Sequence, residues 1–398
     1  MLSERAKSLK TSPTLFLVAK AKELQAQGND VISLTVGEPD WPTYPAASEA
    51  GIEAIRKGIT KYTAANGTLE LRKAITQKIQ SDLNLTYALN EVVVTSGAKF
   101  AIFAALQVLC DPTDEVIIHS PYWVSYPTMV ELAGAKPLLV TCTEETNFKI
   151  TADLLKKNIS PNTKVFLFCS PSNPTGFVYS KQELKEIAEV LKQHPRILVV
   201  SDDMYNRLMF DGASCAPHIF EVAPELKDRC VLINGGSKAY AMTGWRIGWA
   251  LGPQKIIQAI GDYASQSTGA PSSISQYAAA AALANCEANI KETNNTLKQR
   301  LNSALNEFKN IPEFKIYKPD GAFYLWVNIQ KALGKSYQGQ RIISSKDFCQ
   351  VLLEKLYVAT VPGEEFGNPG FMRLSFAISP ERLAEAIQRM KKLISEMI

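Results

Sequence analysis

The chain has 398 residues, 46% of them hydrophobic and 21% charged, which is typical of a globular protein. This length exceeds what one hydrophobic core usually supports, so two domains are expected. The 43 basic and 39 acidic residues give a formal net charge of +4 and form no basic block, which argues against a nucleic-acid or anionic-membrane partner. No apolar run is long enough for a signal core or a bilayer span, so a protein without a membrane partner is expected.

The seven cysteines are scattered along the chain and none forms a close pair. There are only three histidines and none lies near a cysteine cluster, so no metal site is expected. A cysteine in an apolar run, such as Cys169, is expected to be a core thiol. Unpaired thiols fit the reducing cytosol, so a cytoplasmic location is expected.

Short apolar runs alternate with helical segments in the first two thirds of the chain. In chain order, strands are expected at 92–94, 116–118, 164–169, 197–200, 231–233 and 247–251, and helices at 99–109 and 181–193. Apolar strands without polar alternation are typical of strands buried on both faces. Their alternation with helices predicts an α/β fold with a mostly parallel sheet.

The C-terminal part has a different pattern. A long polar helix is expected at 287–308, followed by strands at 322–327, 358–361 and 372–376 and helices at 346–356 and 380–397. This order is typical of an α+β domain. We therefore predict a large α/β domain over residues 45–286, and a smaller α+β domain formed by both chain ends, 1–44 and 287–398.

Chemically useful residues follow four of the expected strands. In α/β sheets, ligands bind beyond the carboxyl ends of the strands. The segments expected at that edge are Ser96-Gly97-Ala98, Asn173-Pro174, Asp202 to Tyr205 and Gly235 to Lys238.

Lys238 follows a strand and a double glycine, and Arg246 comes eight residues later beside further glycines. A lysine that condenses with an aldehyde must be partly desolvated, so that its amine can be neutral and nucleophilic. An arginine nearby can neutralise a phosphate through its planar guanidinium. A solvated lysine in a glycine-rich loop would have the same local sequence.

Asp202 ends a buried strand, where an unpaired carboxylate would be costly. A positively charged pyridinium nitrogen would be a natural partner, because a carboxylate there keeps the ring protonated and able to accept electrons. Asp203 is an alternative, but Asp202 comes directly off the strand; capping of a helix is another possible role. Tyr205, three residues on, could reach a ring oxygen.

Ser96-Gly97-Ala98 lies between a strand and a helix, where small residues let backbone N–H groups approach a phosphate. Ser96 to Lys99 also matches the Ser-x-x-Lys motif of penicillin-binding enzymes. That alternative is rejected because the chain has no matching Ser-Asp-Asn or Lys-Thr-Gly segment.

Seven segments together resemble a known family. They are Val36-Gly37-Glu38-Pro39-Asp40, Tyr62 to Gly67, Ser120-Pro121-Tyr122-Trp123, Ser170 to Gly176, Ser201 to Tyr205, Ser237 to Gly248 and Met372-Arg373-Leu374-Ser375. In this order they resemble the class I aminotransferases of fold-type I, which use pyridoxal 5'-phosphate (PLP). Within that family the chain is similar to the bacterial aspartate aminotransferase branch related to prephenate aminotransferase.

The resemblance implies roles for individual residues. Lys238 would form the Schiff base and move the proton, with Asp202 on the pyridine nitrogen and Tyr205 on the ring oxygen as the other catalytic residues. The further cofactor contacts that it implies are Ser96, Gly97, Ala98, Trp123, Asn173, Ser237, Arg246 and Tyr62 of the partner subunit. The substrate contacts that it implies are Gly37, Trp123, Asn173, Arg373, Lys99 and Thr14, the last two for a distal carboxylate.

Two positions depart from the family pattern. Many members have a serine three residues before the lysine, where this chain has Gly235, and Ser237 or backbone groups would have to substitute for it. The phosphate turn often has two glycines or a Gly-Thr pair, where this chain has Gly97 and Ala98. Both departures concern the affinity for phosphate rather than the reaction.

The resemblance implies a homodimeric aminotransferase that acts on amino acids and 2-oxo acids by a ping-pong mechanism. Aspartate with 2-oxoglutarate is the expected pair. An aromatic or prephenate aminotransferase and a PLP-dependent lyase are the alternatives.

Overall fold

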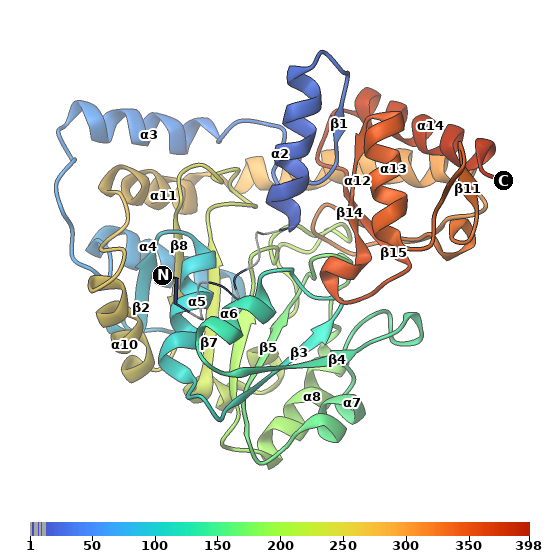
Figure 1. Cartoon of the computed structure of the whole chain (residues 1–398). Helices are drawn as coiled ribbons and strands as arrows, with labels where there is room; N and C mark the ends of the chain where they lie inside the picture. The colour runs from blue at the N-terminus through green and yellow to red at the C-terminus, as the bar shows by residue number, and fades with distance from the viewer. Residues whose placement is uncertain (1, 4–6, 8, 10–12) are drawn as a thin grey trace.

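Seven strands form the larger of the two main sheets of the computed structural model, which describes residues 2–3, 7, 9 and 13–398, the side chains of 13–16 excepted (Figure 1). Their order across the sheet is β2 (Val92–Thr95), β8 (Gly248–Leu251), β7 (Cys230–Gly235), β6 (Leu198–Asp202), β5 (Thr163–Cys169), β3 (Glu115–Ser120) and β4 (Lys136–Thr141). Only β8 runs against its neighbours, so the predicted mostly parallel sheet is confirmed.

Helices cover this sheet. α5 packs against β2, β7 and β8, α10 packs on α5, and α11 packs on α3 and α4. The helices of this part are α3 (Pro45–Arg56), α4 (Leu69–Leu83), α5 (Ala98–Leu109), α6 (Tyr126–Leu132), α7 (Ala152–Asn158), α8 (Lys181–Gln193), α9 (Ile219–Val222), α10 (Gln254–Ser265) and α11 (Ser273–Asn285), with the 3-10 turns η1 (Leu89–Glu91), η2 (Glu144–Thr146) and η3 (Pro224–Arg229).

A smaller antiparallel sheet lies in the C-terminal part, in the order β14 (Val361–Pro362), β15 (Phe371–Ser375), β10 (Tyr324–Asn328) and β9 (Lys315–Tyr317). The N-terminal β1 (Ile32–Ser33) pairs in parallel with β13 (Val358–Ala359), so the helix α2 lies beside the C-terminal elements (Figure 1). The other elements here are α2 (Pro13–Ala26), α12 (Glu287–Phe308), α13 (Ser345–Leu356), α14 (Pro380–Glu396), the pair β11 (Ser336–Tyr337) and β12 (Gln340–Arg341), and the turns η4 (Gln330–Ala332) and η5 (Gly363–Phe366).

α8 shows why local sequence predicts these helices well. Ser180 caps its start: the Ser180 hydroxyl accepts from the Glu183 N–H at 3.2 Å, and the Glu183 carboxylate accepts from the Ser180 N–H at 2.7 Å. Leu184, Ile187 and Leu191 then recur on the buried face. The predicted bounds of α8 and α12 are confirmed residue for residue.

The sheets differ from the prediction in several details, and the short strands β1, β9, β11 and β12 were not predicted. The prediction of a single strand over 358–361 is wrong. Thr360 separates β13 from β14, and the chain passes there from one sheet to the other. β4 was not predicted, because it is an edge strand in which only Val140 is buried, and so lacks a continuous apolar run.

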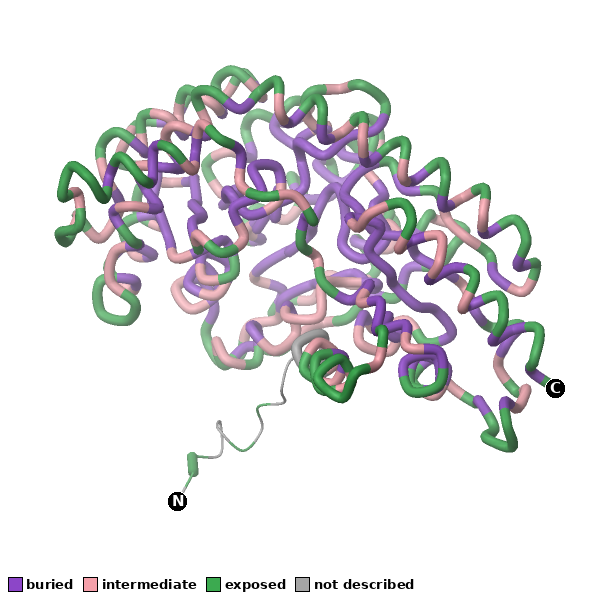
Figure 2. The backbone as a smooth tube through the Cα atoms, turned by 90° about the horizontal axis from the view of Figure 1, so that it is seen from above, coloured by how far each residue is buried: buried purple, intermediate pink, exposed green. Residues whose placement is uncertain are grey.

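The buried backbone runs through the middle of the molecule and exposed turns surround it (Figure 2). One continuous cluster of buried apolar side chains includes residues of both main sheets, such as Val94 and Leu325. The division into domains at residues 45 and 286 stays a prediction. All seven cysteines are unpaired. Within the described residues, no helix is long and apolar enough to cross a membrane and no group of side chains is arranged to hold a metal ion.

Candidate active site

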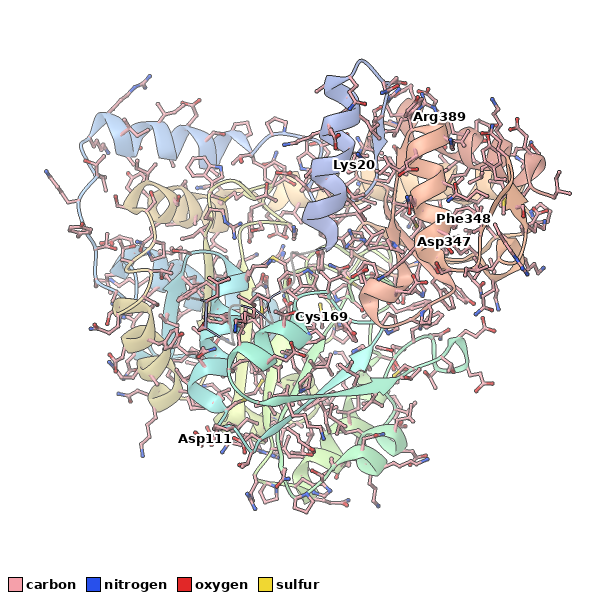
Figure 3. The ribbon with its side chains drawn as sticks, in the orientation of Figure 1. Lys20, Asp111, Cys169, Asp347, Phe348 and Arg389 are labelled. Atoms are coloured by element: carbon pink, nitrogen blue, oxygen red, sulfur yellow. The ribbon has the colours of Figure 1, made fainter. Side chains whose placement is uncertain are left out.

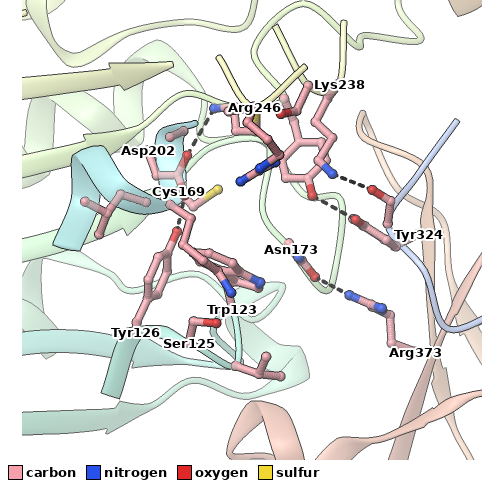
Figure 4. Close-up of a pocket in the computed structure, with 18 residues that line it drawn as sticks. Trp123, Ser125, Tyr126, Cys169, Asn173, Asp202, Lys238, Arg246, Tyr324 and Arg373 are labelled. Carbon is pink, nitrogen blue, oxygen red and sulfur yellow. Dashed lines mark hydrogen bonds between the residues drawn. The ribbon is translucent and has the colours of Figure 1, made fainter. Parts of the chain in front are cut away.

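A cavity of about 310 Å³ lies where strands of the larger sheet end, and residues of both chain ends complete its wall (Figure 4). Most of the predicted site residues line it. The lining residues are Gly37, Ala98, Lys99, Ile102, Trp123, Val124, Ser125, Tyr126, Cys169, Asn173, Asp202, Met204, Tyr205, Ser237, Lys238, Arg246, Tyr324 and Arg373.

The strand directions explain this convergence. β5, β6 and β7 are parallel, so Asn173, Asp202 and Lys238 all come from or follow carboxyl ends at the same edge. β8 runs the other way, so Arg246, two residues before its start, lies at that edge as well. Residues far apart in the sequence therefore meet because of the sheet topology.

Lys238 is partly buried, and its Nζ donates a hydrogen bond to the Gly37 carbonyl. Burial lowers the pKa of its amine to about 8. The negative charge of Glu38 acts to raise this pKa, and the positive charges of Arg373 and Arg246 lower it further. At pH 7 roughly a tenth of the amine is therefore neutral, far more than for an unperturbed lysine, and the neutral form is the one that a nucleophile or proton carrier requires.

The two neighbouring aspartates after β6 face different surroundings. Asp202 lines the cavity, where its Oδ2 accepts from the Tyr126 hydroxyl at 2.6 Å and its Oδ1 from the Met204 N–H at 3.2 Å. Burial raises the pKa of Asp202 to about 6. Asp203 lies outside the cavity lining, accepts from the Ser201 hydroxyl at 2.6 Å and lies 3.2 Å from His218 Nε2.

One end of the cavity combines a helix N-terminus with an arginine. Gly97 has φ of +90°, and a Cβ there would lie 2.7 Å from Arg246 Nη2, so glycine gives the guanidinium room to approach. Ala98, which begins α5, and Ser237 line the cavity, whereas Ser96 and Gly97 do not. These groups form a suitable setting for an anion.

The glycine that departs from the family pattern has a packing reason. A Cβ on Gly235 would lie 2.9 Å from the Ile247 carbonyl oxygen and 3.0 Å from the Gly248 Cα. Both atoms belong to the backbone, so a serine at 235 would require β7 and β8 to shift.

The other end of the cavity holds Arg373, which is only 3% exposed. Its Nη1 donates to Asn173 Oδ1 at 3.0 Å (Figure 4), and its Nη2 donates to the Thr35 carbonyl. Its guanidinium lies 4.5 Å from the Tyr324 ring centre, and burial lowers its pKa. Within the described part of the chain Arg373 forms no ion pair, so its charge is available for an anionic ligand.

Three predicted site residues remain. The Lys99 Nζ lies 5.1 Å from the Trp123 ring centre, and partial burial and then the charge of Arg246 lower the Lys99 pKa. Tyr62 is fully exposed, at 105%, and does not line the cavity of its own chain. Thr14 belongs to α2, but its side chain lies outside the described residues.

Sequence analysis missed several residues of the cavity wall, which are Ile102, Val124, Ser125, Tyr126, Cys169, Met204 and Tyr324. The Tyr324 hydroxyl lies 2.7 Å from the Tyr205 hydroxyl, and Tyr126 bonds Asp202. Tyr126 begins α6, three residues after Trp123, and no local pattern of the sequence distinguishes it. Cys169, expected as a core thiol, is buried near the middle of the molecule but also borders the cavity (Figure 3).

Comparison with known proteins adds independent information. Residues 29–390 match the model of the family described as aminotransferase class I and II. The chain is 44% identical to a probable aspartate/prephenate aminotransferase of Rickettsia bellii (strain RML369-C), over 98% of both chains, and 45% identical to an aspartate aminotransferase of Geobacillus stearothermophilus, over 99% of this chain and 98% of that one.

Solved structures agree in fold. An aspartate aminotransferase from Rhizobium meliloti has a TM-score of 0.96 at 40% identity and full coverage of both chains. An aspartate aminotransferase from Thermus thermophilus, solved with maleate, has a TM-score of 0.92 at 37% identity over 99% of both chains. Sequence and fold thus agree along almost the whole chain, which belongs to the class I and II aminotransferase family and is an aminotransferase of fold-type I.

Proposed function

We propose that the cavity binds PLP and catalyses transamination between aspartate and 2-oxoglutarate by a ping-pong mechanism. The observation that carries this proposal is the set of charged groups in one cavity. Lys238 has a desolvated amine, Asp202 is a buried carboxylate, and Arg373 is a buried guanidinium that forms no ion pair with any described residue.

The residues present fit PLP. The start of α5 at Ala98, with Arg246 above Gly97, would hold the phosphate. The buried Asp202 would hold the protonated ring nitrogen, and Lys238 would hold the aldehyde carbon. Tyr205 and Asn173 would bond the ring oxygen and Trp123 would lie against the ring, as the family resemblance implies. Bound in this way, the ring supplies an electron sink for the bond that breaks at the substrate α-carbon.

The protein's own groups would carry the proton and orient the substrate. The Lys238 amine, with its pKa of about 8, would take a proton from the substrate α-carbon and deliver it to the cofactor carbon. Arg373 would bind the α-carboxylate through its planar guanidinium, and Asn173, which already accepts from Arg373, would hold that guanidinium in place.

A distal carboxylate on the substrate would meet Lys99. Its ammonium borders the cavity beside Trp123, and the desolvation that lowers its pKa also strengthens its attraction for an anion. The names of the Rickettsia and Geobacillus relatives include aspartate, and the Thermus protein was solved with maleate, a dicarboxylate. Prephenate also appears among the relatives' names, so it is the second candidate substrate.

The test compares Lys99→Ala with the unaltered enzyme on aspartate and on alanine. Loss of a direct charge-assisted hydrogen bond should raise the transition-state free energy for aspartate by about 1.5–3 kcal/mol, which lowers kcat/KM roughly 10- to 150-fold. Alanine has no distal carboxylate, so kcat/KM for alanine should change little. Prephenate in the same half-reaction assay decides between the two candidate substrates, and equal losses for aspartate and alanine would remove Lys99 from substrate recognition.

We also propose a cytoplasmic homodimer in which Tyr62 of the partner subunit reaches the phosphate. The support is the full exposure of Tyr62 in the single chain and its absence from that chain's cavity, together with the unpaired thiols. Mixing Lys238→Ala subunits with Tyr62→Phe subunits tests shared sites. Hybrids would then contain one site with both lesions and one with neither, and activity should be regained. Hybrids with no regained activity would exclude sharing.

A further inference from the structure

Tyr126 contacts two residues of the cavity at once. Its hydroxyl donates to Asp202 Oδ2 at 2.6 Å, and its ring meets the Trp123 ring edge-on, with centres 5.3 Å apart and planes at 88° (Figure 4). The Tyr126 side chain is 2% exposed. Burial and the neighbouring Asp202 raise the pKa of its phenol well above the usual value, so it stays protonated and acts as the donor.

Few of the described groups stabilise the ionised form of the Asp202 carboxylate. It is 5% exposed, and its other oxygen accepts only the Met204 N–H within the described residues, at 3.2 Å. The charged or titratable groups that face it are Tyr126 from α6, Cys169 from β5, the adjacent Asp203, and Lys238 after β7. Of these, Lys238 would be committed to the cofactor carbon in the loaded enzyme, and Asp203 repels the charge.

We propose that Tyr126 is a positioning residue of the transamination site, whose hydroxyl keeps the Asp202 carboxylate ionised and aimed at the ring nitrogen. A buried carboxylate that loses a donor becomes easier to protonate, and a protonated carboxyl cannot stabilise a positive ring nitrogen. Tyr126 acts through Asp202 and touches no reacting atom. The catalytic part of this inference depends on the proposed role of Asp202, whereas the effect on the carboxyl itself does not.

The test uses Tyr126→Phe, which removes the donor and keeps the ring against Trp123. Infrared titration of the cofactor-free protein measures protonation of the buried carboxyl, and Asp202→Asn identifies its band. The wild-type carboxyl should titrate near its pKa of about 6, and in Tyr126→Phe we expect a rise of roughly one pKa unit or more. This readout does not require the enzyme to be active, so it stands even if the proposed substrate is wrong.

A double-mutant cycle then tests whether Tyr126 works through Asp202. In the loaded enzyme Tyr126→Phe should weaken cofactor binding and slow the half-reaction by roughly tenfold. In the Asp202→Asn background the same change should have almost no further effect on the cofactor dissociation constant, because no carboxylate is left to hold.

Tyr87→Phe is the matched control. Tyr87 is also buried, at 6% exposed, but its hydroxyl has no hydrogen-bond partner within the described part of the chain. It should leave the Asp202 titration and the cofactor affinity unchanged. If Tyr126→Phe leaves the Asp202 titration unchanged, the proposal is overturned, whether or not activity falls, because the tyrosine would then serve packing alone. Equal effects in the wild-type and Asp202→Asn backgrounds would overturn it too.

Discussion

Two arginines of this chain are equally buried, at 3% exposed, and have opposite surroundings. Arg207 lies in the loop after β6 and reaches α4 and α12. Its Nη1 donates to both carboxylate oxygens of Asp82 at 2.6 Å, and its Nη2 donates to Glu287. Burial works against its charge, but the two carboxylates outweigh burial and raise its pKa. Arg373 borders the cavity and has no ion pair within the described residues, and burial lowers its pKa.

The difference separates a structural ion pair from a binding site. A buried charge must be compensated. Arg207 is compensated by the fold itself, whereas within the described residues the hydrogen bonds of Arg373 go to an amide oxygen and a carbonyl, so a ligand would supply the anion. Asp202 and Asp203 also differ in their surroundings: Asp202 faces the cavity, whereas Asp203 lies outside it, accepts from the Ser201 hydroxyl and lies 3.2 Å from His218 Nε2.

The largest effect is expected for the cavity lysine. Lys238→Ala should keep the fold and abolish transamination, because the other lysine among the described lining residues, Lys99, lies beside Trp123 and cannot take the place of Lys238. Borohydride reduction of the unaltered enzyme, followed by peptide mapping, should place the cofactor on Lys238. Lys149→Ala is the control, since the Lys149 ammonium is already paired with Glu183 at 2.6 Å outside the cavity. A reduced adduct on another lysine would contradict the assignment.

Next in size is the contrast between the two arginines. Arg207→Met should destabilise the protein by about 3 kcal/mol, the lower end for a broken buried pair, since Lys78 still lies 3.1 Å from Asp82. Arg373→Met should leave stability unchanged or slightly raised and lower kcat/KM for every amino acid roughly 100-fold. Urea unfolding and half-reaction kinetics on both variants measure this. A large loss of stability in Arg373→Met would show that the two arginines do not differ in the way proposed.

The aspartates should differ in the same sense. Asp202→Asn should raise the barrier of the half-reaction by about 3 kcal/mol, because an amide cannot stabilise the ring charge. Asp203→Asn should leave that barrier close to wild type and cost about 1–3 kcal/mol of folding free energy, because it disturbs a buried pair. Single-turnover absorbance and urea unfolding separate the two effects, and near-normal turnover of Asp202→Asn would transfer the role to Asp203 or another group.

The smallest effect concerns a buried group that the fold holds neutral. His119 lies in β3, and burial lowers its pKa from 6.5 to about 4. As the pH falls below 6.5, His119 becomes protonated in the unfolded chain but stays neutral in the folded chain. The free energy of unfolding therefore decreases until the pH reaches about 4. Between about pH 7 and about pH 5.5 this should cost about 1.2 kcal/mol. Urea unfolding of wild type and His119→Phe at both pH values measures it, and equal pH dependence in the two would exclude His119 as the cause.

Much of the fold followed from local patterns. Buried runs such as 164–169 and capped amphipathic segments such as 181–193 contain their own signals, and both elements lie where they were expected. The family resemblance to class I aminotransferases is also confirmed. Periodicity could not reveal that β8 runs antiparallel, nor that Thr360 separates two strands, because strand direction and partner are set by contacts between distant segments.

The sequence by itself determined which chemical groups follow the strands: Asn173, Asp202, Lys238 and Arg246. Only the tertiary structure decided what each of them meets. Arg207 and Arg373 both lie in or beside apolar runs of the sequence, and nothing local distinguishes them. Their roles differ because α4 and α12 bring carboxylates to Arg207, whereas no acidic element packs against Arg373 in the described part of the chain. Tyr126 likewise became part of the site only when α6 placed its hydroxyl against Asp202, since a hydrogen bond between residues so far apart in sequence exists only in the folded chain.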